Sequence, residues 1–328
     1  MFKRHIMWFC LPLLAMGSLA AESATLTLSR TIPLPGVKGR FDHFALDLKR
    51  QRLFVAALGN DTLEVIDLKE GKRTLSIPGL GKPTGIVYLE KLDRIFAACG
   101  DDGNVRVYDA TSMRPLKVIP GLEDADNMRS DAEAGMIYAG YGSGALAAID
   151  PSRGEVVGTI KLKGHPESFQ LDQNDGRIFV NVPEAREIAV VDRKSRAVIA
   201  NWPMNRFEEN FPMALDEAGH RLFVGCRKPA RLVVLDTETG KVVADIAISG
   251  DVDDLFYDAA RRRLYAACGE GSIDVISRIG TGAFERVERI PTADGARTGF
   301  FSPDLGEFYL AVPDRGAQKA EIRVFAVK

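Results

Sequence analysis

The sequence contains few residues of the types that carry covalent, redox or metal chemistry. Its 328 residues include only four cysteines, four histidines and two tryptophans. There is no C-x-x-C-H haem attachment motif, no phosphate-binding glycine loop and no recognisable nucleophile motif. No cofactor is therefore evident from the sequence, and a c-type haem is excluded.

A long hydrophobic run is also lacking. Lys3, Arg4 and His5 precede an apolar stretch at positions 6–16, and Ser18-Leu19-Ala20 follows it. This stretch is well short of the roughly 20 apolar residues that a spanning helix needs. The pattern is typical of a secretory signal. We therefore expect a cleaved signal peptide at residues 1–20, a mature chain of residues 21–328 with no membrane span, and a periplasmic or secreted location.

Positive charge is not in excess. Without Lys3 and Arg4, 41 of the 43 basic residues remain against 45 acidic residues, which is a formal charge near −4. The sequence as a whole gives no electrostatic signal for nucleic acid or an anionic membrane. A Pro/Ser/Gly-rich linker is absent too, so we expect a single domain.

What the sequence does contain is a repeat. Arg52 to Asp67 reads RLFVAALGNDTLEVID, a strand, a polar turn and a second strand that ends in Asp. Six variants follow, and the first apolar residues of the seven copies are Leu53, Ile95, Ile137, Ile178, Leu222, Leu264 and Phe308. This period of 41 to 44 residues, with four strand-like segments in each, predicts an all-β, seven-bladed β-propeller of four antiparallel strands per blade.

The two ends of the chain complement each other. The last repeat lacks an outer strand, and the segment at positions 26–35 (LTLSRTIPLP) is a spare strand of the outer-strand type. We therefore expect the N-terminal strand to complete the last blade and close the ring, which leaves no open sheet edge.

The repeat resembles the YVTN-type β-propeller repeat, including that of periplasmic YncE-like proteins. The resemblance lies in the strand-turn-strand unit ending in Ile/Val-Asp, in the turn Thr239-Gly240-Lys241, and in the G-x-P segments Gly81-Lys82-Pro83 and Gly164-His165-Pro166. It implies an architecture and not one reaction, because related propellers include lactonase-like enzymes, a lyase, oxidoreductase subunits and binding proteins.

Several repeated residues are expected to be structural. An Asp closes the third strand of five repeats and should hold the following turn: Asp67, Asp109, Asp150, Asp192 and Asp236. Cys99, Cys226 and Cys268 share one strand position in three different blades. Neighbouring blades are too far apart for a disulfide, so we expect free, buried thiols.

The candidate site is the mouth of the central channel, where the innermost strands begin. Eleven residues before each repeat start stand Asp42, Thr84, Asp126, Glu167, Phe211, Asp253 and Arg297. One position further on are His43, Gly85, Asn127, Ser168, Pro212, Asp254 and Thr298. Crowded carboxylates raise one another's pKa unless a cation intervenes. Either a hydrated acidic rim compensated by Arg297 or a divalent cation would satisfy this pattern, with Asp42, His43, Asp126, Glu167 and Asp253 as candidate ligands.

Two further positions depart from the repeat. Arg129 and Gln170 stand eight residues before their repeat starts, where other repeats have apolar residues. A buried arginine needs a partner, and Asp126, Glu167 or Asp254 would supply one; a ligand carboxylate or phosphate is the alternative.

The candidate ligand-binding residues are thus Asp42, His43, Asp126, Asn127, Arg129, Glu167, Gln170, Asp253, Asp254 and Arg297. His43, Glu167, Arg129 and His165 are the candidates for catalysis.

Three functions remain open at this point. The first is a periplasmic or secreted protein that binds a small molecule or a periplasmic protein partner through the channel mouth and upper loops, without chemistry. The second is a lactonase-like hydrolase or lyase with a metal-assisted site at that mouth. The third is an accessory subunit of a periplasmic oxidoreductase.

Overall fold

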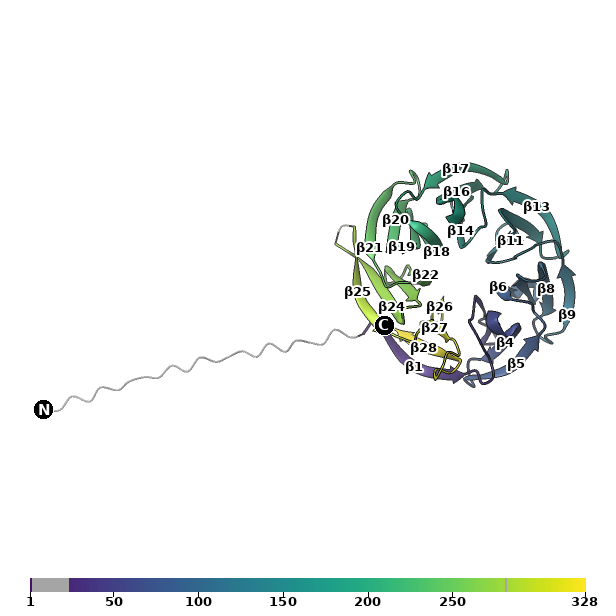
Figure 1. Cartoon of the computed structure of the whole chain (residues 1–328), viewed down its shortest axis with the longest axis horizontal. Coiled ribbons are helices and arrows are strands. Elements are labelled where there is room, and N and C mark those ends of the chain that lie inside the picture. Colours follow the sequence, from purple (N-terminus) through teal and green to yellow (C-terminus); the bar gives the residue numbers. More distant parts are fainter. Residues whose placement is uncertain (2–23, 281) are drawn as a thin grey trace.

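The computed structural model describes residue 1, residues 24–280 and residues 282–328. The predicted signal peptide lies, except for Met1, outside these residues. Within them the chain forms seven four-stranded antiparallel sheets arranged as a closed ring (Figure 1). The predicted seven-bladed propeller is therefore confirmed.

The strands of each blade follow one another from the channel outward. Blade 1 consists of β2 (Phe44–Asp47), β3 (Arg52–Ala57), β4 (Thr62–Asp67) and β5 (Lys72–Pro78). Blade 2 consists of β6 (Pro83–Leu89), β7 (Arg94–Cys99), β8 (Asn104–Asp109) and β9 (Pro115–Ile119). Blade 3 consists of β10 (Met128–Asp131), β11 (Met136–Tyr141), β12 (Ala145–Asp150) and β13 (Glu155–Lys161).

The remaining blades have the same order. Blade 4 consists of β14 (Phe169–Asp172), β15 (Arg177–Val182), β16 (Glu187–Asp192) and β17 (Ala197–Pro203). Blade 5 consists of β18 (Glu208–Asp216), β19 (Arg221–Lys228), β20 (Ala230–Asp236) and β21 (Val242–Ala247). Blade 6 consists of β22 (Val252–Asp258), β23 (Arg263–Cys268), β24 (Ser272–Ile279) and β25 (Ala283–Pro291). Blade 7 consists of β26 (Thr298–Ser302), β27 (Glu307–Val312), β28 (Glu321–Val327) and β1 (Leu26–Pro33).

Ring closure uses the N-terminal strand, as the sequence predicts. In Figure 1 the purple β1 lies along the yellow β28 at the rim of the ring. The two strands pair antiparallel from Leu26 opposite Val327 to Pro33 opposite Glu321. The Arg30 guanidinium also donates two hydrogen bonds to the Glu307 carboxylate, at 2.6 and 3.1 Å. The edge that β28 would expose is therefore covered.

The apolar core lies between the blades. Seven clusters of buried side chains each join strands of two adjacent blades, for example Phe54 and Leu63 of blade 1 with Ile95 and Cys99 of blade 2. The β-branched and aromatic residues of the second and third strands face both neighbours, which explains their almost continuous apolar runs. Cys99, Cys226 and Cys268 are free and buried, as predicted.

Turn residues and bulges complete the blade. Each of the five Asp residues predicted to hold turns accepts a backbone N–H three residues further on, at 2.7 to 3.1 Å. The two outermost strands of every blade have a register shift, which increases the local twist.

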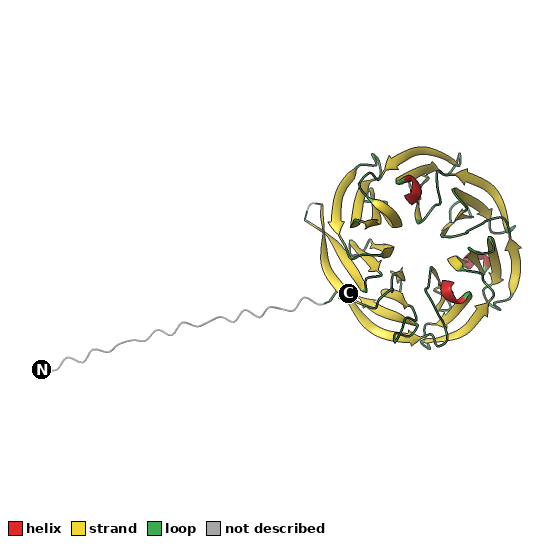
Figure 2. Ribbon diagram, viewed as in Figure 1, coloured by secondary structure: helices red, strands yellow, loops and turns green. Residues whose placement is uncertain are grey.

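Helices are few in the described part of the chain. They are the 3-10 turns η1 (Leu58–Asn60), η2 (Glu90–Leu92) and η3 (Pro183–Ala185), drawn red in Figure 2. None of the helices described has the length and apolar character needed to cross a membrane.

Candidate functional site

The seven residues that stand eleven positions before the repeat starts come together at one cavity. This upper cavity has a volume of about 290 Å³, and Asp42, Thr84, Asp126, Glu167, Phe211, Asp253 and Arg297 all line it. His43, Asn127, Ser168 and Thr298 line it as well. These segments lead into the innermost strands, so successive blades present equivalent residues to the same mouth.

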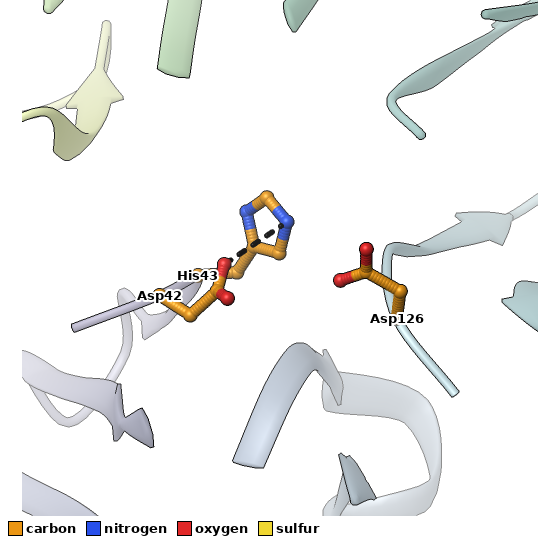
Figure 3. Close-up of side chains that lie close together, drawn as sticks. All are labelled: Asp42, His43 and Asp126. Atoms are coloured by element: carbon orange, nitrogen blue, oxygen red, sulfur yellow. Dashed lines mark ion pairs between the residues drawn. The ribbon is translucent and has the colours of Figure 1, made fainter. Parts of the chain in front are cut away.

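One half of the upper cavity combines carboxylates with imidazoles. Ligand atoms of Asp126, His165 and Glu167 lie within 4.8 Å of one another, and so do those of Asp42, His43 and Asp126. Asp126 is common to both groups. Figure 3 shows Asp42 and His43 from one blade facing the Asp126 carboxylate of another across the opening. Five residues from blades 1, 3 and 4 thus form a mixed nitrogen and oxygen donor set.

His165 is held in a defined orientation. Its Nδ1 lies 2.6 Å from the Gly142 carbonyl oxygen, and because a carbonyl only accepts, Nδ1 carries a proton. Nε2 then lies 3.6 Å from the Asp126 carboxylate. A histidine whose Nδ1–H is bonded to a backbone carbonyl and whose Nε2 faces carboxylates is oriented as metal-binding histidines are. His165 was predicted as a catalytic candidate and not as a metal ligand.

His43 is oriented by a chain of side chains instead. Arg129 Nη1 donates to Asn127 Oδ1, which fixes the amide orientation because arginine cannot accept. Asn127 Nδ2 therefore faces His43 Nε2, at 2.8 Å, and donates to it. Nε2 of His43 accepts a hydrogen bond within the protein, whereas Nε2 of His165 faces the Asp126 carboxylate across the cavity.

The other half of the upper cavity is neutralised by arginine. Asp253 accepts a hydrogen bond from Arg227 and forms an ion pair with Arg297, whose Nε lies 3.0 Å from Oδ2. Arg297 Nη1 also lies 2.6 Å from Asp251, and Arg227 stacks on Phe211 at 4.3 Å from the ring centroid. The expected compensation by Arg297 is present. Asp253, a predicted metal candidate, is instead held in an ion-pair network.

The pKa values of the carboxyl groups in the upper cavity reflect burial, repulsion between carboxylates and contact with cationic side chains. Burial, with the nearby charges of Asp126 and Asp253, raises the pKa of Asp42 well above its usual range. Burial and the charge of Asp126 raise the pKa of Glu167 to about 7. Burial also acts to raise the pKa of Asp126, but His165, His43 and Lys82 together outweigh it, so that this pKa is lowered. The carboxylates therefore repel, and Asp126 is the one that stays ionised most readily.

The pKa values of the two histidines are also shifted in opposite directions. Burial and the positive charge of Arg129 lower the pKa of His43 to about 4, which agrees with an Nε2 that accepts a hydrogen bond. The contact with Asp126 raises the pKa of His165 to about 9, against the opposing effect of burial. His43 is neutral and His165 is cationic at neutral pH.

Arg129, Gln170 and Asp254 lie deeper, in a second cavity of about 330 Å³. His43 and Ser168 line both cavities, so the two adjoin along the channel. The carboxylate partner that the sequence analysis expected for Arg129 is not found among the described residues, where no carboxylate oxygen lies within 4.0 Å of its nitrogens. Arg129 donates its hydrogen bonds to Asn127 and to the Met128 carbonyl, the latter at 2.9 Å. Gln170 Nε2 donates to the Met213 carbonyl at 2.7 Å.

Some residues of the upper cavity were missed by the sequence analysis. Arg40, Lys82 and Asp124 line it, each two positions before a predicted residue. The signal for these three was their common offset of two residues from the channel-mouth positions, because equivalent positions of a cyclic repeat lie at the same mouth. Arg227 also lines the upper cavity but comes from the second strand of blade 5, so it does not share this offset from a channel-mouth position.

Comparisons with known proteins agree with the fold. No protein-family model matches the chain. The chain is 25% identical over 202 residues to YncE of Salmonella typhi and 24% identical over 201 residues to YncE of Salmonella typhimurium. Each match covers 58% of this chain and 55% of the relative, so the chain spans about half the length of the curated relatives that it matches. The resemblance to YncE-like propellers is confirmed.

Solved structures show the same architecture. A chain of the mitotic checkpoint complex superposes with a TM-score of 0.78 at 14% identity, covering 99% of both chains. Hydrazine synthase from Kuenenia stuttgartiensis superposes with a TM-score of 0.74 at 16% identity, covering 89% of this chain and 98% of the other. At such low identity these likenesses support the propeller fold alone.

Proposed function

We propose, on the premise that the chain is a YncE-like seven-bladed propeller, that it is a periplasmic or secreted binding protein that holds a divalent metal ion at the channel mouth. Asp126, His165 and Glu167 are the proposed ligands. Asp42 belongs with His43 to the other group around Asp126. The propeller fold supports a binding role in general terms, and the donor set supports the choice of ligand.

The observation that carries this proposal is the state of the donor atoms. His165 Nε2 faces the Asp126 carboxylate while Nδ1–H is tied to Gly142. Among the described residues no side-chain or backbone group donates a hydrogen bond to the Glu167 or Asp42 carboxylate, although Asp42 is only 9% exposed. Crowded carboxylates whose oxygens face an open cavity repel one another, and a cation shared between them would remove that repulsion.

The donor chemistry favours a transition metal. Imidazole nitrogen with carboxylate oxygen suits Zn²⁺ or Mn²⁺, whereas Ca²⁺ and Mg²⁺ prefer oxygen alone. The metal must displace the Nε2 proton of His165, so affinity should rise with pH towards the pKa of this group, about 9. Binding to the folded state at a concentration 100-fold above the Kd would add about 2.7 kcal/mol of stability. For a chain of this size that is a rise in Tm of about 4 °C.

The test is a metal titration of the mature protein after EDTA treatment, followed by thermal unfolding and calorimetry. Zn²⁺ or Mn²⁺ should raise the Tm, EDTA should reverse the rise, and Glu167→Gln and His165→Asn should each abolish it. His220→Asn is the matched control, because His220 lies 3.6 Å from Glu238 in an exposed turn away from the cavity. Equal stabilisation of the wild type and Glu167→Gln would refute the site.

A hydrolase is the second candidate function. Three protein ligands leave a coordination position open in a cavity of about 290 Å³, as catalytic metal sites require. The metal-loaded wild type should then hydrolyse simple lactones faster than Glu167→Gln. If both proteins hydrolyse them at the rate of buffer with metal, the binding function without chemistry stands.

A further inference from the structure

The second cavity, which we call the lower chamber, differs in character from the channel mouth. Many residues along its walls are apolar, among them Val87 and Phe300, but the surface open to the chamber is more polar than apolar. The volume of about 330 Å³ is room for roughly ten water molecules. A space of this size with a mixed surface fits a small organic molecule that has both an apolar part and a polar end.

The guanidinium of Arg129 is a strong charge that faces the lower chamber. Arg129 uses a single nitrogen, Nη1, for its hydrogen bonds to Asn127 and Met128. Among the described residues no acceptor binds its Nε or Nη2, and its side chain lines the chamber. A guanidinium stays charged in proteins and offers five N–H donors, so the free edge lacks an anion.

The neighbouring polar groups do not supply that anion. Asp254 accepts a hydrogen bond from Gly299 N–H at 2.8 Å, and its oxygens lie more than 4.0 Å from Arg129. Burial raises the pKa of Asp254 to about 8, which favours its neutral form. Gln170 donates a hydrogen bond to the Met213 carbonyl through its Nε2. Its side chain is neutral and supplies no anion to Arg129.

We propose that the lower chamber binds a small monocarboxylate with an apolar body. Its carboxylate pairs with the free edge of Arg129, since guanidinium and carboxylate match as a planar two-bond pair. Its body lies against the aliphatic and aromatic walls. A phosphate dianion would need more positive charge than one arginine provides. This site goes beyond the proposed metal site and does not depend on it.

Binding of hexanoate and benzoate tests the proposal, measured by calorimetry on the mature protein in the presence of EDTA, so that loss of the metal site cannot affect the result. Hexanamide and benzamide, which have the same bodies without charge, are the ligand controls. We expect both acids to bind and both amides to bind at least tenfold more weakly.

Two variants locate the site. Arg129→Met should weaken acid binding about 10- to 100-fold, because a charge-assisted pair is lost. Arg129→Lys keeps the charge and should show a smaller loss, which also covers the case in which the methionine variant fails to fold. Arg153→Met, in an exposed turn, should bind as the wild type does. Equal affinity of the wild type and both Arg129 variants, or binding of inorganic phosphate in preference to both acids, would overturn the proposal.

Discussion

Closure of the ring by β1 predicts a sharp contrast between two substitutions in that strand. Ile32 is fully buried in the cluster that joins blades 7 and 1, opposite Ile322 of β28. Leu28 lies in the same strand and is 50% exposed. Ile32→Ala therefore removes core contacts at the closure, while Leu28→Ala removes a half-exposed side chain at the rim.

The magnitude follows from the atoms removed. Ile32→Ala deletes three buried carbons, which is about 2.4 kcal/mol of transfer free energy at ~0.8 kcal/mol each. The cavity left behind brings the expected cost to about 3–4 kcal/mol. Leu28→Ala loses about half of the transfer term and leaves no cavity, so we expect about 1 kcal/mol.

Urea unfolding followed by fluorescence measures both costs. With a denaturant slope near ~3 kcal/mol per M, Ile32→Ala should lower the urea midpoint by about 1 M and Leu28→Ala by about a third of that. Deletion of residues 26–35 should be more severe and should expose β28 to intermolecular pairing, which size-exclusion chromatography detects. If Ile32→Ala costs no more than Leu28→Ala, β1 does not close the ring in solution.

Two further predictions concern the channel. A Cβ at Gly85 would clash with the Asp126 carbonyl oxygen, so Gly85→Ala should displace this segment, cost about 1–3 kcal/mol in urea unfolding and weaken metal binding. Unchanged calorimetric affinity for the metal would contradict this prediction. The folded-state pKa of Asp254, about 8 against an ordinary 3.8, means that the folded protein retains a proton that the unfolded chain releases. Stability from this group is present below pH ~4 and falls by up to about 1.4 kcal/mol per pH unit until pH ~8. Asp254→Asn should remove this slope between pH 5 and 8, and parallel stability curves for the two proteins would disprove it.

The architecture could be predicted from the sequence because it is encoded locally and repeatedly. Each copy carries its own strands and turn residues, so a strand that is hard to assign in one repeat can be assigned from the other six. The spare strand at positions 26–35 had one vacant place in the ring, which determined the closure. The seven residues that stand eleven positions before the repeat starts could also be placed at the upper cavity, since equivalent positions in a cyclic repeat converge on the axis.

What the sequence could not determine is how those converging side chains pair. Asp42, Asp126 and Asp253 occupy equivalent positions, yet Asp253 is bound by Arg227 and Arg297 while Asp42 has no hydrogen-bond donor among the described residues. The difference arises because Arg227, five residues after its repeat start, stands where the other six repeats have Leu, Gly or Pro.

Arg129 and His165 show the same division. The sequence marked Arg129 as a departure from the repeat and His165 as part of a G-x-P segment. Only the tertiary structure placed His165 Nδ1 against the Gly142 carbonyl and left one edge of Arg129 without an anion. Local propensity and periodicity act along the chain and are readable from it. Pairing across a channel depends on distances between blades and on side-chain orientation, which exist only once the ring has closed.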